Sequence, residues 1–287
     1  MKAITLFISF LFTQSIFAQS KLPVIKVTTN DTIPFTLTSY NAIAIKSIIN
    51  NTDTLQLHFD ASSFDVCITK DAIERNNNLR EVSTLQMGNS VWDNPKTYFV
   101  STTSKGMDGR IGWNLFEGEI ITIDYDNNYL IVQSRLPKHL KGYTKLKLEF
   151  IYSYPCINAT FVKNNEEYTS NFLLDNGSNR AMFLDSAWAG NLNFTSGLQV
   201  IKSSIIKDGA GRNHETKIIS FPLLKVGKHI LANIPSYVLT SKNPFGFEVN
   251  ILGNDLLKKF NTILDFEHDN IYLKPNKLFN SKYNINS

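Results

Sequence analysis

One pattern occurs twice in this chain and constrains the fold more than any other feature of the sequence. The first copy, LQLHFDASS, runs from Leu55 to Ser63, and the second, YTSNFLLDNGS, runs from Tyr168 to Ser178. Each copy is an extended apolar run that ends in an aspartate, Asp60 or Asp175, and continues into a tight turn that closes on serine. A chain that builds one strand-to-aspartate turn twice can bring two carboxylates together on a pseudo-twofold axis.

A second element follows each turn in the same order. Residues 111–116, IGWNLF, match residues 252–257, LGNDLL, and the strand-like segments 120–125 and 261–266 match without a gap. The order of motifs therefore predicts two copies of one structural unit.

The rest of the chain reads almost entirely as short strands, and we expect an all-β fold. Apolar or alternating runs pair across polar turns at 50–53 and 164–167. One constant shift places Asp60 on Asp175, Ile68 on Phe183 and Ala72 on Ala187. Short helices are expected at 70–75, at 185–188, and after Gly112 and Gly253, with Asn114 and Asp255 as their N-caps.

Length and composition are those of a globular protein with a sizeable core. The 287 residues are 43% hydrophobic and 19% charged. A stretch of proline, glycine and basic residues at 134–142 interrupts the strand pattern. We therefore expect an N-terminal lobe at 19–140 and a C-terminal lobe at 141–287.

Residues 1–18 have the features of a secretory signal peptide. Lys2 is followed by an apolar run at 4–12 and by a small-residue cleavage site at 15–18. No later segment is long enough to span a bilayer, and no cysteine follows the cleavage point directly. The sequence predicts a periplasmic or secreted protein without stable membrane insertion.

Charge, histidine and cysteine patterns argue against several other classes. The net charge of +4 comes from scattered Lys and Arg residues, so no nucleic-acid partner is expected. The five histidines lack the spacing of metal ligands, so neither a metal nor a cofactor is expected. For Cys67 in its alternating strand a buried free thiol is the commoner outcome, and nothing in the sequence places Cys156 near it.

The repeated turns resemble the Asp-Thr-Gly-Ser/Ala signature of aspartic peptidases. The elements around Gly112 and Gly253 resemble the hydrophobic-Gly-x-Asp/Asn-Leu motif of the same family, and two copies of both motifs in matching order are more specific than one. The whole mature chain resembles the two-lobed, retropepsin-like aspartic peptidase homologues that Bacteroidota export. This resemblance implies a two-lobed pepsin/retropepsin-like acid protease fold, with a cleft that takes an extended peptide or unfolded protein.

The resemblance also implies a role for each residue of the two turns. Asp60 and Asp175 would be the catalytic pair, sharing one proton because two close carboxylates cannot both ionise cheaply. Ser63 and Ser178 would hydrogen-bond the outer carboxyl oxygens, and Gly177 would let a backbone N–H approach the carboxylate. The ionised partner would activate a water that attacks a peptide carbonyl.

The first turn departs from the family pattern. Ala61 and Asn176 stand where the family has the threonines that interlock the turns, and Ser62 stands where it has glycine. Arg110 replaces the apolar residue that is expected before Ile111. A catalytically silent module that binds a peptide or an envelope ligand is therefore the alternative to the peptidase, and an unrelated β-sandwich adhesin is a third reading.

Two glycine-rich loops are candidates for lids over the cleft. The hairpin at 85–92 has a Gly88-Asn89 tip and supplies Met87 and Gly88 as candidate substrate-binding residues, and the equivalent loop of the second half supplies Gly209, Ala210 and Gly211. Glycine tips suit mobile loops that bind substrate and exclude water. Either loop taken alone is also typical of an ordinary surface hairpin.

Overall fold

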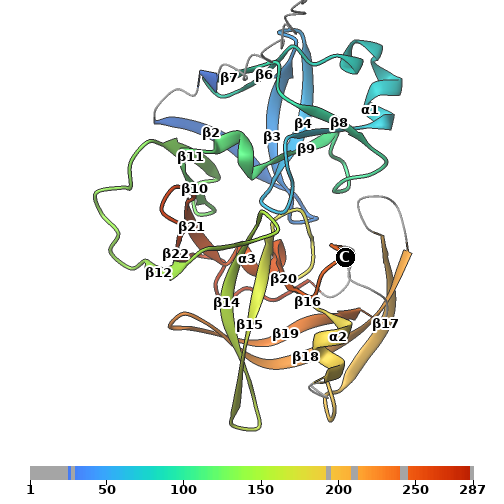
Figure 1. Cartoon of the computed structure of the whole chain (residues 1–287), viewed down its shortest axis with the longest axis vertical. Coiled ribbons are helices and arrows are strands. Elements are labelled where there is room, and N and C mark those ends of the chain that lie inside the picture. The colour runs from blue at the N-terminus through green and yellow to red at the C-terminus, as the bar shows by residue number, and fades with distance from the viewer. Residues whose placement is uncertain (1–24, 27–29, 192–194, 208–212, 240–244, 285–287) are drawn as a thin grey trace, which may run out of the picture.

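The computed structural model describes residues 25–26, 30–191, 195–207, 213–239 and 245–284 (Figure 1). Strands dominate this part of the chain and form two sheets, so the expectation of an all-β fold is confirmed. The expected signal peptide lies outside the described residues.

The larger sheet contains, in chain order, β1 (Ile25–Lys26), β2 (Asp31–Leu37), β3 (Ile43–Ile49), β4 (Asp53–Asp60), β5 (Val66–Thr69), β6 (Thr84–Met87), β7 (Ser90–Asp93), β8 (Thr97–Val100), β9 (Gly109–Gly112), β10 (Ile120–Asp124), β11 (Tyr129–Gln133), β12 (Thr144–Lys147), β21 (Phe260–Asp265) and β22 (Asn270–Pro275). The smaller sheet contains β13 (Glu149–Ile151), β14 (Tyr154–Lys163), β15 (Glu166–Asp175), β16 (Met182–Leu184), β17 (Val200–Lys207), β18 (Asn213–Val226), β19 (His229–Leu239) and β20 (Asn250–Gly253). The short helices are α1 (Lys70–Arg75), η1 (Asn77–Arg80), η2 (Trp113–Phe116), α2 (Ser186–Asn191) and α3 (Asn254–Leu257).

Both halves of the chain build the same four-strand arrangement. In the first half β4 pairs parallel with β9, β9 pairs antiparallel with β5, and β5 pairs parallel with β8. In the second half β15, β20, β16 and β19 repeat these pairings in the same order and directions. The sequence repeat is therefore also a repeat of topology.

The register of these pairs places each aspartate opposite a repeated glycine. Asp60 lies opposite Gly112, and Asp175 lies opposite Gly253. A Cβ on Gly112 would come within 2.4 Å of the Ser63 carbonyl oxygen, and one on Gly253 would come within 2.2 Å of the Arg180 carbonyl oxygen. Only glycine lets the backbones approach this closely.

Strands β10 and β21 pair antiparallel where the two halves meet. The offset that carries Gly112 onto Gly253 also carries Thr122 onto Ile263, and these two residues lie directly opposite each other. Equivalent residues that face each other in an antiparallel pair define a local twofold axis between the strands.

The boundary expected near residue 140 does not separate the two sheets. Strand β12 follows that boundary in sequence, as do β21 and β22, yet all three belong to the larger sheet (Figure 1). The second half thus shares a continuous sheet with the first half.

The structure corrects two local expectations. The constant shift fails beyond the turns. Cys67 lies opposite Arg110, and Phe183 lies opposite Ile251, which is the equivalent of Arg110. Phe183 therefore matches Cys67 rather than Ile68. The second turn therefore contains one extra residue. Asn114 and Asp255 are not N-caps: they lie within η2 and α3, whose cap positions are the glycines, without a side-chain cap.

The core consists of the inward faces of the strands. In β2, for example, Ile33 and Phe35 are buried while the residues between them are exposed, which is the alternation of a strand with one face in the core. Among the described residues no helix is long and apolar enough to cross a membrane.

Candidate active site

The structure brings the two aspartate turns into contact. A Cβ added to Gly177 of the second turn would lie 2.5 Å from the Asp60 Oδ2 of the first turn and 3.1 Å from the His58 Cε1. The Gly177 backbone therefore rests directly against the Asp60 carboxyl, and no larger residue fits there without displacing it.

Asp60 is buried and is held by its own turn. Its Oδ1 accepts hydrogen bonds from the Ser62 backbone N–H at 2.8 Å and from the Ser62 hydroxyl at 2.7 Å. Its exposed fraction is 6%. These bonds fix the orientation of the carboxyl plane.

Asp175 is partly exposed, and its Oδ1 accepts a hydrogen bond of 2.9 Å from the Ser178 backbone N–H. Loss of hydration raises the pKa of Asp175 to about 7, and the negative charge of Asp60 contributes to the rise. The nearby Ser62 side chain and the backbone of the turn lower the pKa of Asp175 in part. The Ser62 side chain thus acts on both carboxyls, and its hydroxyl proton is donated to Asp60.

The serine hydroxyls that the family pattern assigns to the outer carboxyl oxygens have other partners here. Ser63 Oγ accepts a hydrogen bond of 2.9 Å from Arg110 Nε. Ser178 Oγ accepts one of 3.2 Å from the Arg180 backbone N–H. In the second turn the backbone of Ser178, not its hydroxyl, holds the aspartate.

A different interlock replaces the one that Ala61 cannot make. Asn176 is buried, and its amide donates to Asn254 Oδ1 at 3.0 Å and to the Tyr125 hydroxyl at 3.3 Å. Tyr125 donates in turn to Asn254 at 2.6 Å, and burial raises the pKa of its phenol, which keeps it a neutral donor. Because Tyr125 follows β10 of the first half, this triad ties the second turn to the first half.

Asn41, in the β2–β3 loop, makes a second tie between the halves. Its amide donates to the Asn179 carbonyl at 3.1 Å, and Lys258 donates to its side-chain oxygen at 2.7 Å. Lys258 also forms an ion pair of 2.7 Å with the fully buried Asp255. Sequence reasoning missed Asn41 and Lys258 because the bond between them joins residues far apart in the chain.

A buried histidine lies beside the first aspartate. His58 Nε2 is 2.8 Å from Thr103 Oγ1, and its Nδ1 is buried without a hydrogen-bond partner. Burial lowers the pKa of His58 to about 4, against the attraction of the Asp60 charge. The imidazole is therefore neutral over most of the pH range. The spacing of the histidines in the sequence gave no sign of this contact with the site.

The two predicted lids fare differently. Met87 is fully buried, and the hairpin tip is bound to Asp31 of β2, whose carboxylate accepts from the Asn89 backbone at 2.9 Å and from the Ser90 hydroxyl at 2.7 Å. A Cβ on Gly88 would lie 2.8 Å from the same carboxylate. This geometry ties the hairpin tip to β2, and the role of Met87 and Gly88 in binding substrate stays a prediction.

The second predicted lid, with Gly209, Ala210 and Gly211, lies outside the described residues. The loop between β8 and β9 contacts the site instead, because Ser104 Oγ donates to the Gly177 carbonyl at 2.9 Å. Its polar sequence, STTSKG, carried no signal that distinguished it from a surface loop.

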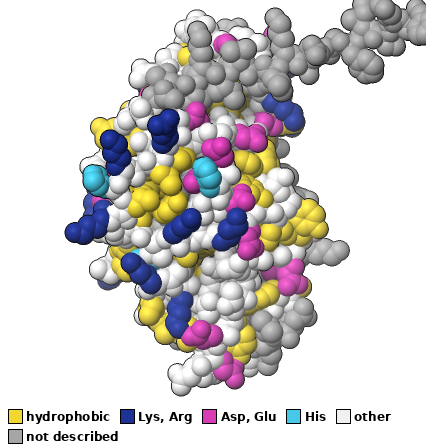
Figure 2. Space-filling model, turned by 60° about the vertical axis from the view of Figure 1, so that its left-hand side comes forward, with side chains coloured by type: hydrophobic (Ala, Val, Ile, Leu, Met, Phe, Trp, Pro, Cys, Tyr) yellow, Lys and Arg dark blue, Asp and Glu magenta, His cyan; other side chains and the backbone are white. Residues whose placement is uncertain are grey.

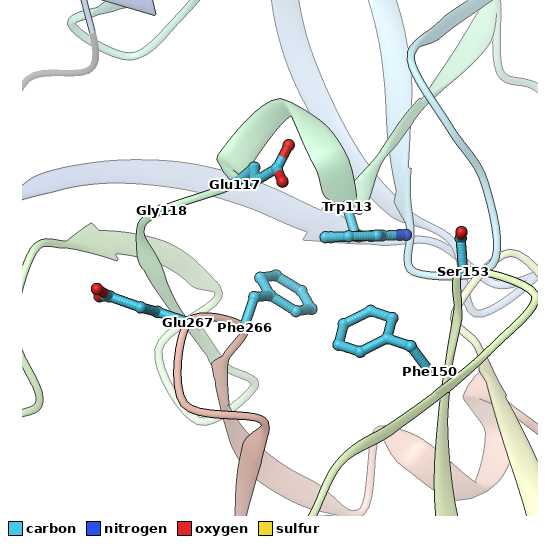
Figure 3. Close-up of a pocket in the computed structure, with 7 residues that line it drawn as sticks. All are labelled: Trp113, Glu117, Gly118, Phe150, Ser153, Phe266 and Glu267. Atoms are coloured by element: carbon cyan, nitrogen blue, oxygen red, sulfur yellow. The ribbon is translucent and has the colours of Figure 1, made fainter.

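A separate pocket of about 580 Å³ lies at the end of η2 (Figure 3). Three aromatic rings form its apolar part: Trp113 lies 5.0 Å from Phe150 and 4.9 Å from Phe266, measured between ring centroids. Glu117 and Glu267 also line it. Phe64 connects Trp113 to Tyr154 through further ring contacts, so an aromatic wall runs from this pocket toward the aspartate turns.

The cysteines and the residue types that bind metals are the remaining candidates for site chemistry. Cys67 and Cys156 are both buried free thiols, and within the described ranges no cluster of His, Cys, Asp and Glu could hold a metal ion. On the face in Figure 2 side chains of both charge signs surround a hydrophobic patch.

No protein-family model matches this chain, and a search of curated proteins finds no match.

Proposed function

We propose that this protein is an exported aspartic peptidase with a two-lobed, pepsin/retropepsin-like fold, whose nucleophile is a water activated between Asp60 and Asp175. One observation carries the proposal: two topologically equivalent turns face each other, with Gly177 of one against the Asp60 carboxyl of the other. Two carboxyls this close repel each other, which costs free energy of folding. Packing alone therefore does not explain the arrangement.

The mechanism follows from the single proton that such a pair retains. Asp60 carries the negative charge and accepts a proton from the attacking water, while protonated Asp175 donates to the peptide carbonyl oxygen as it gains charge. Because Asp175 has a pKa of about 7, the pair keeps this proton in mildly acidic solution and loses it as the pH rises through 7. Cleavage should therefore be strongest at mildly acidic pH. The substrate is an extended peptide or an unfolded protein that lies along the cleft.

One observation favours the alternative, a catalytically silent binding module on the same fold. The Ser62 hydroxyl donates to Asp60 and the Ser62 side chain acts on Asp175, which is the role that a bridging water would take. In this alternative the hydroxyl replaces the water, and the cleft holds a peptide or an envelope ligand without cleaving it.

A pH series on the mature chain with a mixed peptide library separates the two functions. Cleavage should appear below about pH 7, and both Asp60→Asn and Asp175→Asn should abolish it, because an amide can neither share the proton nor activate water. Cleavage that persists in both variants would identify a contaminant or another site.

Ser62→Gly tests the role of the hydroxyl directly. The variant removes the side chain that acts on both carboxyls, so it should raise the cleavage rate or leave it unchanged. Ala61→Thr, which restores one side of the family interlock, should act in the same direction. No cleavage at any pH, even by the Ala61→Thr/Ser62→Gly double variant, would favour the binding module.

A further inference from the structure

Three polar side chains lie abreast next to Asp60, on three neighbouring strands. Arg110 of β9 lies opposite His58 of β4 on one side and opposite Cys67 of β5 on the other. His58 is two residues before Asp60, so both side chains are on the same face of the sheet. This row therefore borders the first aspartate.

The equivalent row of the second half is entirely apolar. There Ile251 lies opposite Leu173 and Phe183, and Leu173 is two residues before Asp175. These three side chains belong to a small hydrophobic cluster apart from the main core. The Asp60 turn thus has a polar row beside it that contains the cation Arg110. The equivalent Asp175 turn has an apolar row in the same place.

The polar row faces the opposite half of the molecule. His58 contacts the Gly177 turn, and the charges of Asp60 and Arg110 both act on Tyr154 of β14. Since β14 belongs to the smaller sheet, the row lies between the halves rather than on the outer surface.

Arg110 has an incomplete set of partners there. Its Nε donates to Ser63 Oγ at 2.9 Å, but no carboxylate of the described residues lies within ion-pair distance of it. The residue is only partly exposed. A partly desolvated guanidinium without a carboxylate is costly, and an anion that binds it in a bidentate manner removes that cost.

We propose that Arg110 is a specificity-determining residue that binds an acidic side chain of the substrate on the Asp60 side of the cleft, while the buried row of Leu173, Phe183 and Ile251 offers no such charge on the other side. This inference rests on the proposed cleft function. The preferred peptide therefore has Glu or Asp on the Asp60 side of the cleft only.

Binding to the full mature chain tests the inference without requiring cleavage. The Asp175→Asn variant is titrated calorimetrically with a peptide that has Glu-Phe at its centre, with the Phe-Glu peptide, and with the Gln counterpart of each. One of the two Glu peptides should bind roughly tenfold or more tightly than its Gln counterpart, because a charge-assisted bond is lost in the amide.

Variants assign this preference to one side chain. Arg110→Ile, which installs the residue of the second half, should bring the Glu-to-Gln affinity ratio close to one, and Arg110→Lys should retain part of it. Arg135→Ile, the same change at an exposed arginine, is the matched control and should leave the ratio intact.

The outcomes for the inference and for the peptidase are distinguishable. A Glu preference that depends on Arg110 supports the inference even if no peptide is ever cleaved. Equal binding of Glu and Gln peptides, a preference that survives Arg110→Ile, or no binding of any of the four peptides would overturn it, whether or not the library is cleaved.

Discussion

The Asp175→Asn substitution should change how the stability of this protein depends on pH. In the folded state the pKa of Asp175 is raised from 3.8 to about 7, first by loss of hydration and then by the charge of Asp60. A carboxyl with a raised pKa contributes stability fully below its unfolded pKa, and that contribution is lost as the pH rises through the folded pKa. Asparagine resembles the protonated acid and has no proton to lose.

The size of the effect follows from the two pKa values. At about 1.36 kcal/mol for each pH unit between them, the upper bound is about 4 kcal/mol. Asp175 is partly exposed, so solvent screening reduces the expected difference to about 2–3 kcal/mol. In a chain of this size that difference corresponds to roughly 5–10 °C in Tm.

Urea and thermal unfolding of both proteins from pH 4 to pH 8.5 measure this difference. The two should be similar in stability near pH 4, and the variant should become more stable by about 2–3 kcal/mol as the pH passes 7. Asp71→Asn, at an exposed carboxylate of α1, controls for the loss of one negative charge. Curves for wild type and Asp175→Asn that stay parallel across the range would refute the raised pKa of Asp175 from which the difference is derived.

Three further substitutions probe the surroundings of the pair. Gly177→Ala places a methyl group 2.5 Å from Asp60 Oδ2, so it should destabilise by about 1–3 kcal/mol in urea unfolding and abolish cleavage; wild-type stability would contradict the close approach. Asn176→Ala removes the amide that donates to both Tyr125 and Asn254 and should cost about 1–3 kcal/mol by the same measurement, whereas a neutral change would show that the triad does not hold the turn. His58→Leu removes a base whose pKa is lowered from 6.5 to about 4, so the wild type should lose up to about 3 kcal/mol relative to the variant as the pH falls from 6.5 to 4, and an unchanged acid-unfolding profile would disprove it.

Local patterns were sufficient to predict the two aspartate turns and the strands that lead into them. The apolar runs before Asp60 and Asp175 alternate with the period of a strand, and small residues after them permit a tight turn. The match of Gly112 with Gly253 also followed from sequence, since a close backbone approach tolerates no side chain. Asp124 and Asp265 each accept a backbone hydrogen bond from their own hairpin, which is a local contact of the same kind.

Patterns could not predict which groups meet across the molecule. Met87 and Gly88 have the composition of a mobile tip, but Asp31, distant in sequence, binds that tip to β2. The one-residue insertion in the second turn became visible only in the strand pairing, and the backbone bonds agree: Gly253 N–H donates to the Ala181 carbonyl, whereas Gly112 N–H donates to the Asp65 carbonyl.

The sequence by itself determined that this chain forms strands, that it contains one unit twice, and that each unit ends a strand in an aspartate. Those properties depend on periodicity and turn chemistry within a few residues. The tertiary structure alone decided that Ser62 acts on both carboxyls, that Ser63 receives Arg110, and that Asn176 joins Tyr125. A hydroxyl, amide or guanidinium takes whichever partner the packed strands bring within about 3 Å, and that choice is made by long-range register rather than by neighbours in the chain.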